Sequence, residues 1–146
     1  MRMRAFFPTR LRSGVLVAAA LTACGHAYGT TLSGTSPAPV PDAFECVKKQ
    51  LQALGYSQSS IDMAEYRITA KKYDETVRRP DVNFRRIVDR IEIQVAPGTG
   101  GAITSLEVAA KTFAELTTQR GPTEQQERTS PEAAAAAQTI VEECGK

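Results

Sequence analysis

The chain has little of what most enzymes use. In 146 residues it contains no tryptophan, three cysteines and one histidine, His26. Catalysis by a Ser-His or Cys-His pair, and ordinary zinc sites that use histidine, need an imidazole held by rigid surroundings. His26 lies in a stretch rich in Gly, Ser, Thr and Pro that offers no such support. We therefore expect no catalytic residue, no metal site and no cofactor.

Nucleotide-binding and metalloprotease motifs are also missing. The sequence contains no GxGxxG, no Walker loop and no HExxH. The glycine-rich stretch 97–101 is not followed by a helical pattern that could bind phosphate, so it predicts a hairpin turn. These absences argue against an enzyme of the common nucleotide- or metal-dependent kinds.

The first 23 residues resemble a targeting segment. They carry four arginines (Arg2, Arg4, Arg10 and Arg12) and no acidic residue, and they end in the apolar run 15–23. That run is too short to cross a bilayer, which takes about 20 apolar residues. A basic start, a short apolar run and small residues at its end are typical of a secretory signal. The alternative is a buried N-terminal helix, but the segment has no polar face.

Residues 21–24 read Leu-Thr-Ala-Cys, which resembles the lipobox of bacterial lipoproteins. The resemblance implies cleavage before Cys24 and acylation of the Cys24 thiol. Two or three acyl chains anchor a protein stably, because each buried methylene contributes about 0.8 kcal/mol. In the family rule for Gram-negative bacteria, Asp after the cysteine retains the protein at the inner membrane. Gly25 therefore implies the periplasmic face of the outer membrane.

Removal of residues 1–23 reverses the net charge. The full chain has 18 basic and 16 acidic residues, and the remainder keeps 14 basic and all 16 acidic ones, a formal net charge of −2. The basic balance of the full chain is therefore no argument for nucleic-acid binding. Residues 24–41 have no apolar period and predict a flexible tether, so residues 42–146 would form a single domain.

Two helices are indicated, over residues 43–54 and 131–144. Asp42 is a suitable N-cap for the first, and Gly55 follows it where a left-handed residue commonly ends a helix. Ser130 is a suitable N-cap for the second, and Pro131 fits its first position. Each helix has one apolar stripe: Phe44, Val47, Leu51 and Leu54 in the first, and Ala133, Ala137, Ile140 and Cys144 in the second.

Three strands are predicted between the helices. Apolar and polar residues alternate over 66–73, 87–95 and 106–116. One polar face per strand favours an antiparallel sheet with one side in water. We therefore expect an α+β fold with the order α-β-β-β-α, a two-layer sandwich of a three-stranded antiparallel sheet with both helices on one face.

Asp89 interrupts the apolar face of the second predicted strand. It is either a buried carboxylate with a raised pKa, the partner of a neighbouring arginine, or the mark of a strand edge.

Once Cys24 is assigned to lipid, Cys46 and Cys144 remain. An even pair in an exported protein predicts a disulfide. The two residues lie near the start of the first helix and the end of the second, so the helices must be antiparallel for them to meet. The long segment 117–129 would run the length of the sheet to allow this. Two unpaired buried thiols are the alternative, and the pair has no CxxC spacing that would suggest redox activity.

The connection between the first two strands is rich in arginine. Two Arg-Arg pairs, Arg78-Arg79 and Arg85-Arg86, flank Pro80 and Asp81. Such a cluster predicts a contact with an anionic partner, either lipid headgroups or an acidic envelope protein. Acidic residues are interleaved with the basic ones, and mixed charge of this kind is commonly only a solvated face.

The order of the predicted elements and the placement of Cys46 and Cys144 are similar to those of small αβββα envelope lipoproteins. They also resemble, in outline, the helix-on-sheet domains of outer-membrane assembly lipoproteins. The resemblance implies a membrane-anchored, non-catalytic binding or structural module. A small-ligand carrier or an enzyme with a pocket between sheet and helices is the alternative.

Overall fold

The structure, a computed structural model, describes residues 28–145. The predicted signal segment 1–23, the predicted acylation site Cys24, and His26 lie outside the described residues. Eight elements follow one another along the chain: β1 (Thr30–Ser36), α1 (Val40–Ala53), β2 (Ser57–Asp62), β3 (Arg67–Asp74), β4 (Phe84–Pro97), β5 (Thr104–Thr118), β6 (Gly121–Glu127) and α2 (Pro131–Cys144).

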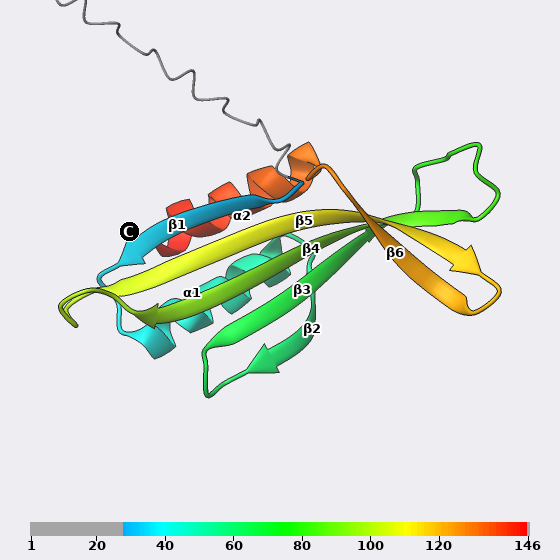
Figure 1. Ribbon diagram of the computed structural model, residues 1–146. Coiled ribbons are helices and arrows are strands. Elements are labelled where there is room, and N and C mark those ends of the chain that lie inside the picture. Colours follow the sequence, from blue (N-terminus) through cyan, green and yellow to red (C-terminus); the bar gives the residue numbers. More distant parts are fainter. Residues whose placement is uncertain (1–27, 146) are drawn as a thin grey trace, which may run out of the picture.

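All six strands belong to one antiparallel sheet. Its main order is β1-β5-β4-β3-β2, and β6 also pairs with β5. β4 accompanies β5 along almost its whole length, whereas the opposite edge of β5 is shared by two shorter strands. β1 pairs with residues 104–110 of β5, and β6 pairs with residues 112–118. The long β4–β5 hairpin is therefore the centre of the sheet, to which β1, β3 and β6 pair directly and β2 is joined through β3 (Figure 1).

The prediction of a three-stranded sheet in the order α-β-β-β-α is wrong. The predicted strands correspond to β3, β4 and β5, and the structure adds β1, β2 and β6. Residues 30–36, which the sequence places in the tether, form β1, so that part of the tether prediction is corrected. The segment 117–129 does not run the length of the sheet but turns back as β6. The three added strands are mostly polar, and backbone pairing to existing strands holds them, so no apolar alternation marks them in the sequence.

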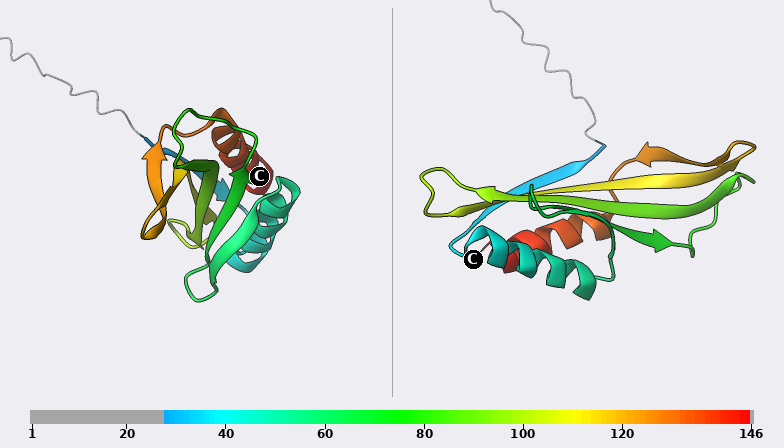
Figure 2. Two further views of the ribbon diagram at one scale, coloured as in Figure 1. Left: turned by 90° about the vertical axis from the view of Figure 1, so that its right-hand side faces the viewer. Right: turned by 90° about the horizontal axis from the view of Figure 1, so that it is seen from below.

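Both helices pack side by side against one face of the sheet and run in opposite directions (Figures 1 and 2). The core lies between the two layers and consists of apolar side chains from both helices and from β3, β4 and β5. Its largest fully buried members are Phe44, Val47, Leu51, Ile68, Ile91, Ile93, Val95, Leu106, Val108 and Ile140. These side chains alternate along the strands or repeat along the helices as predicted, which confirms the apolar faces read from the sequence.

The helix ends differ in how well the sequence predicts them. Ser130 is the N-cap of α2, and its Oγ accepts a hydrogen bond from the Ala133 N–H, as predicted. α1 begins at Val40, earlier than predicted, so Asp42 lies in its first turn rather than at its N-cap. Gly55 has φ +81°, the left-handed conformation expected after the helix.

A glycine allows α2 to approach the edge of the sheet. A Cβ placed on Gly34 in β1 would lie 2.8 Å from Cγ1 of Val141, so only a residue without a side chain fits without a shift. α2 therefore packs directly on β1, which makes β1 part of the core layer and not an appendage.

The sheet is longer than the helices. The far end of β4 and β5, together with β6 and the connection 75–83, projects beyond the helical layer (Figure 2, right). The strand register places Phe84, Ile87, Ala114 and Leu116 on one face of this end of the sheet. Arg79 of the connection 75–83 lies over the ring of Phe84 on this face, where the predicted arginine site is found.

Candidate binding site

Three of the four predicted contact arginines surround one hollow in the surface. Arg78 and Arg79 lie in the connection 75–83, and Arg85 follows Phe84 at the start of β4. These three side chains, with Glu75, Val77 and Phe84, line an open hollow of about 470 Å³. The arrangement combines guanidinium groups with an aromatic ring, which suits an anionic group attached to an apolar one.

Arg79 fastens the connection to the sheet. Its guanidinium forms a two-point ion pair with Glu127 at the end of β6, in which Nη2 donates to Oε2 at 2.7 Å. The same guanidinium lies over the ring of Phe84, with Cζ 4.8 Å from the ring centroid. The hydrogen bonds from Arg79 hold the pKa of Glu127 below its usual value, although partial burial acts against them. Arg79 therefore covers the apolar overhang and is already paired.

Arg78 and Arg85 are less completely paired than Arg79, so more of their N–H groups are left to bind a ligand. Arg78 is exposed and donates to the backbone carbonyls of Glu75 and Val77, and among residues 28–145 it forms no ion pair with a carboxylate. Arg85 is also exposed and pairs with Glu115 at 3.0 Å. Glu115 is shared with Arg86, so one carboxylate balances two guanidinium groups.

Arg86 does not line the hollow. It lies on the opposite, open face of the sheet, where its Cζ is 3.8 Å from the centroid of the Tyr73 ring. It forms ion pairs with Glu75 and Glu115 at 3.2 Å each, and only 17% of its side chain is exposed. We conclude that Arg86 supports the strands and positions Glu115 rather than facing solvent.

The open face of the sheet carries a layer of stacked and paired side chains beyond Arg86. Arg90 lies over the ring of Phe113, with Cζ 4.4 Å from the centroid, and it shares Glu124 on β6 with Lys71. Beneath these side chains Val88 is fully buried although it lies on the open face. Sequence analysis missed this layer, because the pairing of Lys71, Arg90 and Phe113 with β6 depends on a strand it did not predict.

Asp89 lies on the helix side, where the sheet meets the start of α2. It is 6% exposed, and its two oxygens accept hydrogen bonds from Thr112 Oγ1 at 2.5 Å and Ser130 Oγ at 2.9 Å. The structure thus assigns Asp89 two hydroxyl partners, in place of the arginine that the sequence offered as one alternative. Asp89 also lines a cavity of about 220 Å³ whose wall includes Arg79, Glu127 and Arg128.

Tyr56 lies near the same joint. Its hydroxyl is buried and has no hydrogen-bond partner among residues 28–145. Burial raises the pKa of Tyr56, and the nearby Asp89 and Glu132 carboxylates raise it further. Tyr56 therefore stays neutral, and its ring packs as part of the core.

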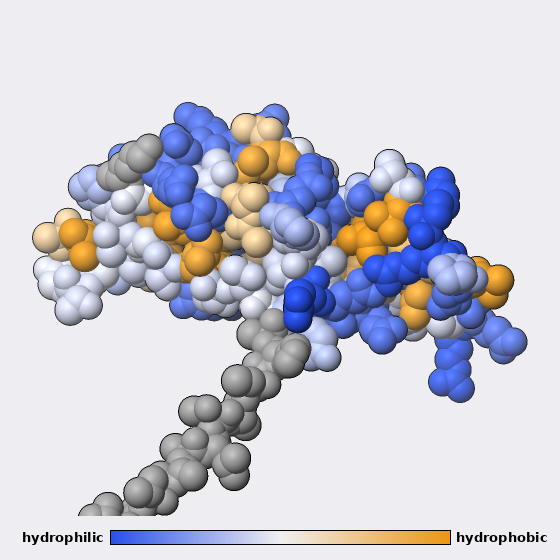
Figure 3. Space-filling view, turned by 90° about the horizontal axis from the view of Figure 1, so that it is seen from above, coloured by the Kyte–Doolittle hydropathy of each residue, from blue (hydrophilic) through white to orange (hydrophobic). Residues whose placement is uncertain are grey.

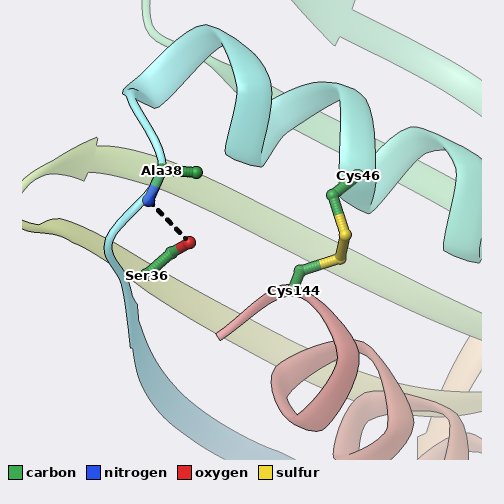
Figure 4. The surroundings of a disulfide bond; sticks show 4 residues. All are labelled: Ser36, Ala38, Cys46 and Cys144. Atoms are coloured by element: carbon green, nitrogen blue, oxygen red, sulfur yellow. Dashed lines mark hydrogen bonds between the residues drawn. A yellow bond between two sulfur atoms is a disulfide. The ribbon is translucent and has the colours of Figure 1, made fainter. Parts of the chain in front are cut away.

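Cys46 and Cys144 form a disulfide that joins the two helices, which confirms the predicted pairing. Their Cα atoms are 5.8 Å apart, and 98 positions separate them in the chain. Figure 4 shows Cys46 on α1 facing Cys144 at the end of α2, beside the turn in which Ser36 Oγ accepts from the Ala38 N–H at 3.3 Å. The antiparallel helices that this pairing requires are observed, and β6 is the element that returns the chain to the start of α2.

Comparison with known proteins gives no family for this chain. No protein-family model matches it, and no curated protein matches it. Within residues 28–145, neither helix has the length and apolar character needed to cross a membrane. The same residues contain no group of three or more histidine, cysteine or carboxylate side chains placed to hold a metal ion.

Proposed function

We propose that this protein is a lipoprotein of the bacterial cell envelope, anchored through Cys24 at the periplasmic face of the outer membrane. It acts there as a non-catalytic binding or structural module. The observation that carries the proposal is the Cys46–Cys144 disulfide. Structural disulfides persist in oxidising compartments, to which a secretory signal leads. The disulfide and the sequence of residues 1–24 therefore indicate the same destination.

The non-catalytic role is supported by how the two layers meet. Phe44, Leu51, Ile93 and Ile140 are among the fully buried side chains that fill the space between the helices and the sheet. A carrier or an enzyme with a pocket at this place, which is the alternative, would need that space to open. Melting the protein in the presence of envelope metabolites tests the alternative, since a ligand that binds only the folded state raises the melting temperature.

We propose that the arginine hollow is the contact for an anionic partner. Arg78, Arg79 and Arg85 line it, and Arg86 positions the Glu115 carboxylate behind it. A guanidinium group binds phosphate or carboxylate through two parallel hydrogen bonds, which favours arginine over lysine at such a place. The partner is then an anionic lipid or an acidic envelope protein and not a nucleic acid, since the chain without residues 1–23 has a net charge of −2.

The anchor is tested by producing the full chain in a Gram-negative host with a labelled fatty acid. We expect label in the mature protein, and mass spectrometry should find an acylated N-terminal peptide that begins at Cys24. Cys24→Ala should remain an uncleaved, unlabelled precursor. Gly25→Asp is a matched control that should keep the label but move the protein to the inner membrane. Normal labelling of Cys24→Ala would refute the anchor.

A further inference from the structure

The described chain begins close to the proposed anchor. From Cys24 to Tyr28 there are four residue steps, which span at most about 14 Å. Tyr28 is tied to the domain, because its carbonyl accepts hydrogen bonds from the N–H and the Oγ1 of Thr129 at 3.1 and 3.0 Å. If Cys24 is acylated, as the proposed function states, the side of the domain around Tyr28 is held next to the bilayer.

The arginine connection is held on this same side. Thr129 follows Glu127 and Arg128 in the chain, and Glu127 binds Arg79. Arg79 and Arg128 line the same cavity at the start of α2. In Figure 1 and in the left view of Figure 2, the connection 75–83 arches toward the top of the picture, where β1 also begins. One run of contacts therefore leads from the first described residues to the arginine hollow.

Exposed side chains on this side suit a membrane surface. Tyr28 is 59% exposed and Val82, in the arginine connection, is 95% exposed. Arg128 is exposed and, within residues 28–145, forms no ion pair. Tyrosine favours the interfacial region of a bilayer, and arginine is attracted to anionic headgroups. Figure 3 looks onto this side and shows hydrophobic residues bordered by strongly hydrophilic ones at the overhanging end.

The acidic residues at and before the connection accept hydrogen bonds from their own neighbours. Asp74 Oδ1 accepts hydrogen bonds from the N–H and the hydroxyl of Thr76 at 2.8 and 2.6 Å. Asp81 Oδ1 accepts from the Asn83 N–H at 2.9 Å. Both carboxylates therefore bind donors close to them in the chain, while the Arg78 guanidinium donates to carbonyl groups and forms no ion pair among the described residues.

We propose that the anionic partner is the phospholipid leaflet that holds the anchor. Arg78 and Arg128 contact anionic headgroups, and Tyr28 and Val82 enter the interfacial region. The opposite edge of the sheet, formed by β2, points away from the membrane. This orientation rests on the proposed function. A lipid surface is favoured over an acidic protein, because the link from Cys24 to Tyr28 is short and holds this side of the domain next to the headgroups. Guanidinium groups that come within a Debye length of about 8 Å of the headgroups are attracted to them.

The orientation is tested with tryptophan as a depth reporter, since the chain has none of its own. The full acylated protein is reconstituted into vesicles of phosphatidylcholine and phosphatidylglycerol that contain brominated phosphatidylcholine. Variants Tyr28→Trp and Val82→Trp should be quenched by the brominated lipid. Met63→Trp is the matched control, because Met63 is 53% exposed in the turn between β2 and β3 at the opposite edge. Its fluorescence should equal that in vesicles without bromine.

Charge reversal tests the role of the arginines. In the Val82→Trp background, Arg78→Glu with Arg128→Glu should reduce the quenching severalfold. Lys49→Glu with Arg67→Glu makes the same change of charge at exposed positions on α1 and β3 and should leave the quenching unchanged.

The outcomes separate the two proposals. An unacylated protein overturns the proposed function and this orientation with it. An acylated protein whose Val82→Trp variant is unquenched overturns the orientation alone. The anionic partner of the arginines would then be an acidic protein. Equal quenching of Met63→Trp and Val82→Trp also overturns it, since the domain then has no preferred side.

Discussion

Ser130 joins the start of α2 to strand β4 through Asp89. The Ser130 hydroxyl donates to Asp89 Oδ2 at 2.9 Å and accepts from the Ala133 N–H at 3.0 Å. One hydroxyl thus caps the helix and binds the sheet. Thr112 on β5 reinforces the joint, since its hydroxyl donates to Asp89 and accepts from the Ser130 N–H at 2.8 Å.

Replacing Asp89 with alanine should lower the free energy of unfolding by about 1 to 3 kcal/mol, because two buried hydroxyl groups lose their acceptor. Asp89→Asn should cost less, since the amide oxygen still accepts one of these bonds. Urea denaturation measures both. Glu92→Ala is the control on the same strand, where a half-exposed pair with Lys111 is lost and the change should stay within about 0.5 kcal/mol. Equal stability of Asp89→Ala and wild type would show that the joint contributes nothing.

Removing the disulfide should destabilise the domain without changing its fold. Cys46→Ala with Cys144→Ala opens a covalent loop that spans 98 positions and should cost about 2 to 5 kcal/mol. Thermal unfolding measures the loss, and reducing agent should lower the stability of wild type but not of the double variant. The finding of two free, alkylatable thiols in the mature protein would contradict the pairing.

Arg86 and Arg78 should respond differently to the same substitution. Arg86→Ser removes the stacking on Tyr73 and leaves the buried Glu115 with one partner, so it should cost about 2 kcal/mol. Arg78→Ser removes only exposed bonds to carbonyl groups and should stay within about 0.5 kcal/mol of wild type. Urea denaturation of the two variants side by side provides the measurement. Equal losses would mean that the stacking and ion pairs of Arg86 contribute no stability beyond that of an exposed residue.

The Arg79–Glu127 pair should make part of the stability depend on pH. The hydrogen bonds from Arg79 hold the pKa of Glu127 below its usual value of 4.5. A carboxylate whose pKa is depressed in the folded state stabilises the fold above the usual pKa, and the contribution is lost as the pH falls through the folded pKa. The difference in unfolding free energy between wild type and Glu127→Gln should therefore be largest near pH 7 and shrink below pH 4.5. Because Glu127 is only partly buried, the difference should be small. A difference that does not change between pH 7 and pH 3 would contradict this account.

The sequence by itself determined the elements that bury their own side chains. β3, β4 and β5 alternate apolar and polar residues, and α1 and α2 each present an apolar stripe, so burial of these faces left a readable period. The disulfide was predictable for a similar local reason. Two cysteines remain on the two helices once Cys24 is assigned to lipid, in a chain whose first residues resemble an export signal, so each has few other partners.

Tertiary structure alone decided the other three strands. β2 reads SQSSID and is exposed throughout, and β6 reads GPTEQQE with no buried residue. Such segments become strands only because a neighbouring strand offers unpaired backbone groups. Their side chains carry no apolar alternation from which the strand could be predicted. β1 was read as tether for the same reason, although Gly34 and Leu32 place it against α2.

The same limit applied to the arginine cluster. The sequence showed four arginines close together, and their spacing in the chain is identical whether they are free or paired. The carboxylates that distinguish them come from β5 and β6, as Glu115 and Glu127. Long-range strand pairing brought these partners to Arg79, Arg85 and Arg86 and left Arg78 without one among the described residues. Composition determines how much charge a surface carries, but only the fold decides which charges remain unpaired, because ion pairs form between residues that are distant in sequence.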